Sequence, residues 1–394
     1  MAQPAQLDRG QRRTVSQAVS QAVGPGSTWR PWMQRALQLA ALGAGRTSPN
    51  PLVGCVVLDA DGQLVGEGFH ARAGTPHAEV HALRQAGERA RGGTAVVTLE
   101  PCCHHGRTPP CCDALLAAGV ARVVVAMADP DPRVAGQGIA RLRAAGVEVI
   151  SGIGETEAQA LNQAFVHRLA SGRPLGILKW AMSADGRTAL PNGSSQWISG
   201  PPARAWVHRL RAGCDAVIVG GGTVRADDPL LTSRGIRAPE PLRVVLSRHL
   251  DLPPQARLWQ CSDAATLVAH GPAAPAEARA RLDALGVERL ELPRCEPERL
   301  LAALAERGCN QVLWECGPGL AAAALRQGCV QRIAAVLAPK LLGGESARTP
   351  LGDLGLVDVA QATPWNGERL TRLGEDLLWW LEPPRPAPPG PSPD

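Results

Sequence analysis

Four residues in the first half of the chain have the types and spacing of a catalytic metal site. His77 and Glu79 lie two positions apart, and Cys102 and Cys111 follow them. An imidazole and two thiolates are ligands that Zn²⁺ favours, and three such ligands leave a fourth tetrahedral position for water. A glutamate two residues from the histidine cannot easily bind the same ion, but it can reach the metal-bound water and move protons. The pattern predicts one catalytic zinc ion per chain.

This combination of residues is typical of hydrolytic deamination of an amino-bearing ring, in which the glutamate moves protons while zinc-bound hydroxide attacks the ring carbon. Eight residues separate Cys102 from Cys111, which is longer than the usual Pro-Cys-x-x-Cys spacing. The loop between them contains His104, His105 and Arg107 and is polar and basic. We expect this loop either to form one wall of a substrate pocket or to be an ordinary turn.

A closed structural zinc site is the alternative reading of the same cluster. It would need a fourth protein ligand from Cys103, His104, His105 or Cys112, and it would have no use for Glu79. The pairing of histidine and glutamate favours the catalytic site. We otherwise expect Cys103 and Cys112 to be buried as small apolar side chains.

Each of the three ligands is predicted at the end of a regular element. His77 stands just before a helix predicted over 78–90, and Cys111 opens a short helix behind two prolines. A helix amino terminus favours negative charge, which keeps this cysteine as a thiolate. Cys102 follows a Val-rich strand predicted over 94–99, at the end of the strand where α/β sheets bind ligands. The three elements therefore converge on one crevice.

Strand and helix patterns alternate along most of the 394 residues, a length that favours two domains. We predict an α/β fold, with a mostly parallel sheet in the first domain. A predicted helix over 156–170 leads to the domain join, and the second domain repeats the alternation. The predicted organisation is a disordered extension over 1–29, a first domain over 30–172, a second domain over 173–382 and a Pro-rich tail over 383–394.

Composition limits the classes of partner and location. The chain has no Tyr and two Phe, so extended nucleic-acid binding by base stacking is not expected. A net charge of +5, spread along the chain, suits an anionic small-molecule substrate. Eleven cysteines, some of them adjacent, favour a reduced cytoplasmic protein over a disulfide framework. No segment reaches the ~18 apolar residues of a membrane span, and the amino-terminal residues favour a disordered extension over a transit peptide.

The second half contains two glycine-containing turns after predicted strands. They are Gly220-Gly221-Gly222-Thr223 and the run from Glu315 to Gly319. Such turns let backbone N–H groups approach a phosphate at a helix amino terminus. Neither matches the dinucleotide pattern G-x-G-x-x-G, and a tight strand-to-helix turn explains each of them equally well.

Three motifs of the first half together resemble the bifunctional deaminase–reductases of riboflavin biosynthesis. They are His77-Ala-Glu-Val-His, the run Thr98-Leu-Glu-Pro-Cys-Cys-His-His-Gly-Arg-Thr-Pro-Pro-Cys111, and Asp129-Pro-Asp-Pro. The resemblance covers about residues 31–381 and implies a cytidine-deaminase-like three-layer domain. It further implies that His77, Cys102 and Cys111 bind zinc, that Glu79 is the proton shuttle, and that Asn50 helps to hold the pyrimidine.

The second half is similar to the reductase part of that family, whose fold resembles dihydrofolate reductase and which implies NADPH. The motifs are Lys179–Arg187, Ser194–Ile198, Val219–Pro229 and Ala338–Gly343. Matching positions imply cofactor contacts from Ala181, Trp197, Thr223, Asp227 and a loop of Gly317, Pro318, Gly319, Leu320, Ala321, Ala322 and Ala323. They imply substrate contacts from Ser195, Arg211, Leu231, Arg234 and Glu315. Guanidinium groups suit a sugar phosphate. Three positions depart from the pattern, namely Ala184, Ser247 and Cys316.

The resemblance implies two consecutive steps on one phosphoribosylaminopyrimidine. Zinc-dependent deamination comes first, and NADPH then reduces the ribosyl group to ribityl. It further implies a homodimer or larger homo-oligomer through the reductase domain, with no nucleic-acid or membrane partner. Two alternatives remain open at this stage, a nucleic-acid base deaminase with an accessory domain and a non-enzymatic zinc-stabilised binding module. A third possibility is that the second half has lost its activity.

Overall fold

The structure is a computed structural model that describes residues 25–104, 109–132 and 134–384. Most of the predicted amino-terminal extension, His105 and Arg107 of the intercysteine loop, and residues 385–394 of the tail lie outside the described residues. The chain forms two compact units, residues 1–169 and 170–394. Each unit is described by itself, and the domain limits given above stay predictions.

The first unit is built on a five-stranded sheet with the order β2-β1-β3-β4-β5. Its β1 pairs antiparallel with both β2 and β3, whereas β3, β4 and β5 are parallel. The prediction of a mostly parallel sheet was therefore wrong for half of its pairings. The connection from β2 to β3 places β1 between these two strands, and both of them run opposite to β1. The strands are β1 (Gly54–Leu58), β2 (Leu64–Phe69), β3 (Thr94–Leu99), β4 (Arg122–Met127) and β5 (Glu148–Ser151).

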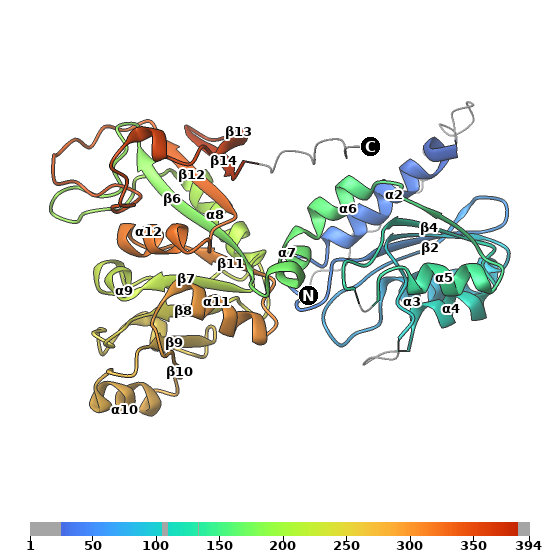
Figure 1. Ribbon diagram of the computed structural model, residues 1–394, viewed down its shortest axis with the longest axis horizontal. Helices are drawn as coiled ribbons and strands as arrows, with labels where there is room; N and C mark the ends of the chain where they lie inside the picture. The colour runs from blue at the N-terminus through green and yellow to red at the C-terminus, as the bar shows by residue number, and fades with distance from the viewer. Residues whose placement is uncertain (1–24, 105–108, 133, 385–394) are drawn as a thin grey trace, which may run out of the picture. The chain divides into compact units, whose positions relative to one another are not determined.

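Helices cover both faces of this sheet, which gives the unit three layers (Figure 1). One layer contains α2 (Pro25–Ala41) and α6 (Glu155–Leu161), and the other contains α3 (Ala78–Ala86), α4 (Cys111–Ala118) and α5 (Gln137–Ala144). Alternate residues of the strands fill the two cores, as expected for side chains that point to opposite faces. Val57 and Val97 pack under α3, while Val56 and Val96 pack under α2.

Two predicted helices are interrupted. The helix expected over 78–90 ends at Ala86, where Gly87 adopts a positive φ of 57° and begins a 3₁₀ turn, η1 (Gly87–Ala90). The helix expected over 156–170 divides into α6 and α7 (Gln163–Ser171) at Asn162. The Asn162 side chain accepts a hydrogen bond from the Leu52 N–H (2.8 Å) and donates one to the Leu52 carbonyl (3.0 Å). This pair ties the end of α6 to the loop that carries Asn50.

Glycines allow α3 to lie directly on β2. A Cβ atom at Gly66 would stand 2.1 Å from the Ala82 carbonyl oxygen, and one at Gly68 would stand 2.4 Å from that of Ala78. Both separations are too short for any side chain, so close helix–strand contact requires glycine at these positions. The contact fixes the first turn of α3, next to His77.

The second unit is built on a nine-stranded sheet with the order β10-β9-β8-β7-β11-β6-β12-β14-β13. Its strands run parallel from β10 to β12, and β14 and β13 are antiparallel additions at one edge. The strands are β6 (Leu175–Ser183), β7 (Ala216–Gly220), β8 (Leu242–Leu246), β9 (Thr266–His270), β10 (Glu288–Glu291), β11 (Gln311–Trp314), β12 (Arg332–Ala338), β13 (Asn366–Leu373) and β14 (Asp376–Glu382).

The sequence patterns missed β9, β10 and β13. Strand β10 has four residues with a glutamate at each end, and β13 is largely exposed and polar, so neither has the apolar alternation of a strand. The helices are α8 (Pro201–Ala212), α9 (Gly221–Asp227), α10 (Ala276–Ala284), α11 (Pro297–Glu306) and α12 (Pro318–Arg326), with 3₁₀ turns η2 (Arg257–Trp259) and η3 (Val359–Gln361). Trp314 is fully buried at the centre of the core between α11, α12 and the sheet.

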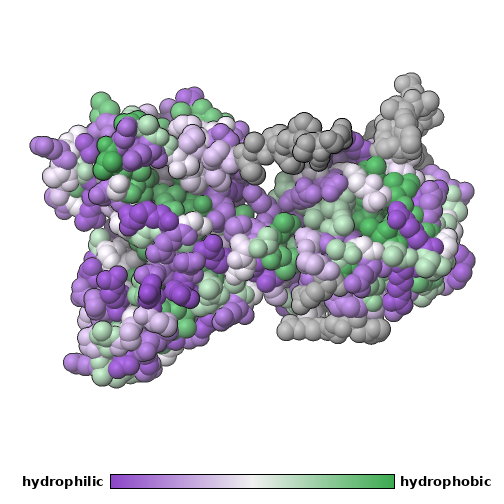
Figure 2. Space-filling view, in the orientation of Figure 1, coloured by the Kyte–Doolittle hydropathy of each residue, from purple (hydrophilic) through white to green (hydrophobic). Residues whose placement is uncertain are grey.

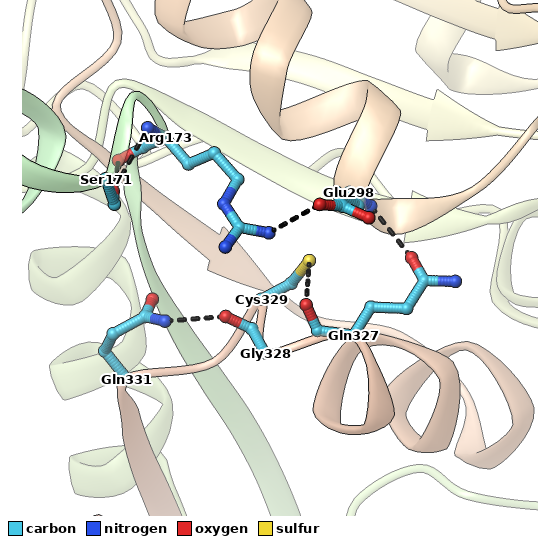
Figure 3. Close-up of polar contacts among 7 residues, drawn as sticks. All are labelled: Ser171, Arg173, Glu298, Gln327, Gly328, Cys329 and Gln331. Carbon is cyan, nitrogen blue, oxygen red and sulfur yellow. Dashed lines mark hydrogen bonds and ion pairs between the residues drawn. The ribbon is translucent and has the colours of Figure 1, made fainter.

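Polar contacts hold the beginning of β6 against α11 and the end of α12 (Figure 3). The Arg173 guanidinium lies 3.2 Å from a Glu298 carboxylate oxygen, and the Glu298 N–H donates to the Gln327 side chain (3.0 Å). The Gln331 amide donates to the Gly328 carbonyl (2.8 Å). These contacts fix the amino end of β6, a strand whose carboxyl end leads into the predicted reductase site.

Candidate functional site

A pocket of about 490 Å³ opens at the carboxyl ends of β3 and β4 in the first unit. It is lined by residues from the β1 loop, the start of α3 and the segments that follow β2, β3 and β4. Five of them are central to its chemistry, namely Asn50, His70, His77, Glu79 and Cys102. Four of these residues, all except His70, were predicted from the sequence.

The three predicted metal ligands meet at this pocket. The ligand atoms of His77, Cys102 and Cys111 all lie within 4.8 Å of one another. The Nδ1 atom of His77 is 3.2 Å from the Cys111 sulfur and 3.6 Å from the Cys102 sulfur. Zinc bonds of about 2.3 Å to sulfur and about 2.0–2.1 Å to nitrogen imply a nitrogen–sulfur separation of roughly 3.6 Å in a tetrahedron. The described side chains thus fit a zinc ion.

The two thiols are coupled by a shared hydrogen bond. A hydrogen bond from the Cys111 thiol lowers the pKa of Cys102, and the same contact raises the pKa of Cys111. The Cys111 N–H at the start of α4 donates a further hydrogen bond to the Cys102 sulfur (3.3 Å). Two adjacent thiolates repel each other, which disfavours ionisation of both. A divalent metal bound there would offset this repulsion and displace the shared proton.

Glu79 lies in the first turn of α3 and is 3% exposed. Burial raises the pKa of this carboxyl group. Its Oε2 atom has no hydrogen-bond partner among the described residues. A buried carboxylate oxygen without a partner is costly, and here it faces the pocket beside the ligands. The arrangement suits a group that exchanges protons with a bound water or substrate.

The structural-zinc alternative finds no fourth ligand within the described part of the chain, where the metal-capable cluster has three members. Cys112 is buried in the core, and its thiol donates to the Pro101 carbonyl (3.4 Å). Cys103 is partly exposed rather than buried as expected, and its thiol faces Gln137. His104 lines the pocket, whereas His105 lies outside the described residues.

His70, which follows β2, is a pocket residue that the sequence reasoning missed. Its Nδ1 atom donates to the Pro76 carbonyl (3.3 Å), and its Nε2 atom therefore accepts from the Asn50 amide (3.0 Å). Burial lowers the pKa of His70, which agrees with this neutral form. His70 thereby fixes the orientation of Asn50. A lone histidine after a strand carries no motif, so the sequence offered no signal for it.

The second unit brings its two glycine-containing turns together. Strands β7 and β11 are neighbours, so the turns that follow them lie at one edge of the sheet. A Cβ atom at Gly317 would stand 3.8 Å from the Thr223 hydroxyl, and one at Gly220 would stand 3.3 Å from Leu320. Residues 318–323 form the first turns of α12 rather than the predicted loop, and Gly317 is the residue before the helix. Ala321 and Ala322 are buried in the core.

A buried ionic cluster lies beside these turns. The Arg211 guanidinium makes a bidentate contact with the Glu315 carboxylate (2.5 and 3.0 Å) and donates to the Thr232 carbonyl (3.0 Å). The Lys179 ammonium is 3.9 Å from the same carboxylate. Burial raises the pKa of Glu315, but Arg211 outweighs this effect and the pKa lies below its usual value. Burial lowers the pKa of Lys179. The sequence reasoning assigned no role to Lys179.

Two of the other predicted reductase residues are in direct contact. The Ser195 hydroxyl donates to the Asp227 carboxylate (3.3 Å), which joins a predicted substrate residue to a predicted cofactor residue. Leu231 is buried, with a positive φ of 57°, and Arg234 is exposed with a φ of 60°. Ala181 lies on β6, and Trp197 is exposed with the Arg204 guanidinium over its ring. No contact joins these last four residues directly.

A second cleft, of about 440 Å³, lies between the ends of β7 and β8 and one face of α12. Leu246 and Leu320 form apolar walls, and the exposed side chains of Arg248 and His249 stand at the rim after β8. The cleft adjoins Gly220, so it continues the edge on which the two glycine turns meet.

Comparisons with known proteins agree with this division. Residues 27–127 match the family model "cytidine and deoxycytidylate deaminase zinc-binding region", and residues 174–379 match the "RibD C-terminal domain". The riboflavin biosynthesis protein RibD of Synechocystis is 49% identical over 347 residues, which cover 88% of this chain and 94% of that protein. RibD of Escherichia coli is 43% identical over 371 residues, which cover 89% and 98%.

Solved structures show the same fold. Acinetobacter baumannii RibD (form 1) superposes with a TM-score of 0.84 at 42% identity, covering 91% of this chain and all of that chain. A diaminohydroxyphosphoribosylaminopyrimidine deaminase/5-amino-6-(5-phosphoribosylamino)uracil reductase from Thermotoga maritima superposes with a TM-score of 0.82 at 34% identity and the same coverage. The predicted fold class, a cytidine-deaminase-like domain followed by a reductase domain, is confirmed.

Fold and site thus define a two-domain enzyme that joins a zinc-dependent deaminase to a reductase using a nicotinamide cofactor. The chain belongs to the RibD family of bifunctional riboflavin biosynthesis proteins. Among the described residues, no helix combines the length and the apolar character that crossing a membrane requires.

Replacement of Cys102 by Ala should abolish stoichiometric zinc binding, because two ligands leave the ion poorly held. The neighbouring Cys103→Ala variant is the matched control, since its thiol faces Gln137 and not the ligand cluster. Elemental analysis of both purified proteins should find about one zinc ion per chain in the control and far less in the Cys102 variant. Equal zinc content in the two variants would contradict the assignment.

Proposed function

We propose that the chain deaminates a diaminopyrimidinone that carries a phosphoribosylamino group and then reduces the ribosyl group of the product with NADPH. The observation that carries the first step is the cluster of His77, Cys102 and Cys111 beside the buried Glu79 carboxylate. The Thermotoga maritima relative is named for both activities. The assignment of individual site residues is part of this proposal.

In the deaminase pocket, His77, Cys102 and Cys111 would hold zinc, which when bound lowers the pKa of a water into the neutral range. Glu79 accepts the proton of that water at Oε2 and delivers it to the departing amino nitrogen. The raised pKa of this carboxyl group assists such a two-way transfer. Asn50, oriented by His70, contacts the edge of the pyrimidine. The pocket walls limit the entry of other water molecules.

In the reductase unit, the cofactor supplies hydride when bound, and the chain's own groups orient the two reactants. The turns at Gly317 and Gly220 approach the cofactor phosphates with backbone N–H groups. Arg211 and Arg234 hold the substrate phosphate or hydroxyl groups, with Arg211 fixed in place by Glu315. Burial lowers the pKa of Lys179. Its ammonium group would donate a proton to the sugar oxygen as the ring opens.

The alternatives retain less support. A zinc-stabilised binding module does not explain a buried carboxylate whose Oε2 atom has no hydrogen-bond partner among the described residues, and a nucleic-acid deaminase does not explain the reductase unit. Two pairs of the predicted reductase residues are in direct contact, Arg211 with Glu315 and Ser195 with Asp227, which supports an intact second half. A cytoplasmic location stays a prediction.

Glu79→Gln tests the central proposal. The variant should keep its fold and its zinc but lose roughly 10²–10⁴-fold in deamination rate, because an amide cannot shuttle the proton. Ammonia release from the diaminopyrimidine substrate measures the first step, and NADPH oxidation with the deaminated intermediate measures the second. The second step should be unchanged, so each preparation contains its own folding control. Full ammonia release by the variant would contradict the role of Glu79.

The choice of NADPH over NADH is proposed from Arg248 and His249 at the rim of the second cleft. A guanidinium near the adenosine ribose accommodates the 2′-phosphate. Arg248→Ala should raise the Kd for NADPH about tenfold, a loss of ~1.4 kcal/mol, with little change for NADH. Fluorescence titration with each dinucleotide measures both constants. Arg257→Ala is the control, because Arg257 does not line the cleft. An equal loss for both cofactors would show that Arg248 does not read the phosphate.

A homo-oligomer through the second unit is proposed from its exposed apolar side chains. Figure 2 shows hydrophobic residues on the visible surface of this unit. Val357 and Val359 are each 89% exposed, and Leu370 on the edge strand β13 is 63% exposed. Exposed apolar side chains on an unpaired edge favour association. Light scattering should find a dimer or larger assembly that Leu370→Lys weakens; a monomeric wild-type protein would contradict this proposal.

A further inference from the structure

Glu100 is a buried carboxylate in the first unit that the mechanism above does not use. It follows β3, two positions before Cys102, and is 3% exposed. Its two oxygens accept four backbone hydrogen bonds at ordinary distances. The donors are the N–H groups of Asp129 (3.0 Å) and Gly136 (2.9 Å) to Oε2, and of Gly138 (2.8 Å) and Ile139 (3.1 Å) to Oε1.

These four donors come from the segment after β4 and the first turn of α5. The N–H groups of a first helical turn have no partner within the helix, so Glu100 satisfies donors that would otherwise be buried without one. The same segment is also in direct contact with the backbone, because a Cβ atom at Gly138 would stand 2.0 Å from the Pro101 carbonyl oxygen. The start of α5 therefore rests on Glu100 and Pro101 through two independent contacts.

The segment that Glu100 holds is a wall of the deaminase pocket. Asp129, Asp131 and Val134 line the pocket together with His77 and Glu79. The Asp131 N–H donates to the Asp129 carboxylate (2.9 Å), which makes the wall continuous with the Glu100 contact at Asp129. A shift of the Glu100 contacts would thus move the wall, whereas His77 and Cys111 are held at the starts of α3 and α4.

We propose that Glu100 is a positioning residue that holds the Asp129–Asp131 wall in the geometry that binds the pyrimidine substrate. The inference rests on the deaminase function proposed above. A carboxylate is required because it accepts on both oxygens, whereas a glutamine would turn its NH₂ group toward one pair of N–H donors. Replacing the carboxylate should therefore displace the wall and weaken substrate binding. Zinc binding and the proton transfer by Glu79 should be retained.

Glu100→Gln tests this proposal with the full-length zinc-loaded protein. We expect KM for deamination to rise about tenfold or more, while kcat changes less than about threefold and zinc stays near one ion per chain. Reduction of the deaminated intermediate by the same preparation should be unchanged. Glu88→Gln, an exposed glutamate of the same unit, is the matched control and should leave all values unchanged.

Two results would overturn the proposal. Unchanged KM in Glu100→Gln would show that the wall does not depend on the carboxylate, even if the melting temperature falls. Loss of zinc together with kcat would show that Glu100 acts through Cys102 instead. Where Glu100→Gln does not fold, Glu100→Asp keeps the charge but reaches fewer donors, and the same two criteria apply to it. A wild-type protein without deaminase activity would refute the proposed function itself.

Discussion

The proximity of two sulfur atoms and one imidazole nitrogen is the constraint on which the first unit depends. These groups come from three elements that are far apart in sequence, and each element is fixed by a separate close contact. Glycines of β2 let α3 lie on the sheet, two prolines begin α4 at Cys111, and a parallel ladder carries β3 to the same edge. Two thiolates at this distance repel each other, so a bound cation would stabilise the arrangement.

The second unit also contains a buried group of charged side chains, and these pair with one another. Here two cationic side chains share one anion, since Arg211 and Lys179 both contact the Glu315 carboxylate at the carboxyl end of β11. A buried charged group is tolerated where it is paired and hydrogen-bonded, and the bidentate contact between Arg211 and Glu315 satisfies that condition. Both units therefore place a cluster of ionisable side chains at the carboxyl edge of a sheet.

The sequence was most informative where chemistry requires particular residue types at particular spacings. His77, Glu79, Cys102 and Cys111 could be named because zinc and proton transfer restrict the choice of side chain. His70 and Glu100 could not, because their roles depend on hydrogen bonds to backbone or amide groups that carry no pattern. Strand β13 was missed for a similar reason, since its exposed polar residues lack the alternation of a half-buried strand. Long-range pairing, not local preference, determines such features.

The hydrogen bonds between the Asn162 side chain and the Leu52 backbone connect the end of the first unit to the loop that carries Asn50. All three ligands and Glu79 precede residue 112, but Phe165 and Arg168, which line the pocket, belong to the helix after Asn162. The pocket is therefore complete only when this last helix is in place, although every predicted ligand atom comes from the first 111 residues.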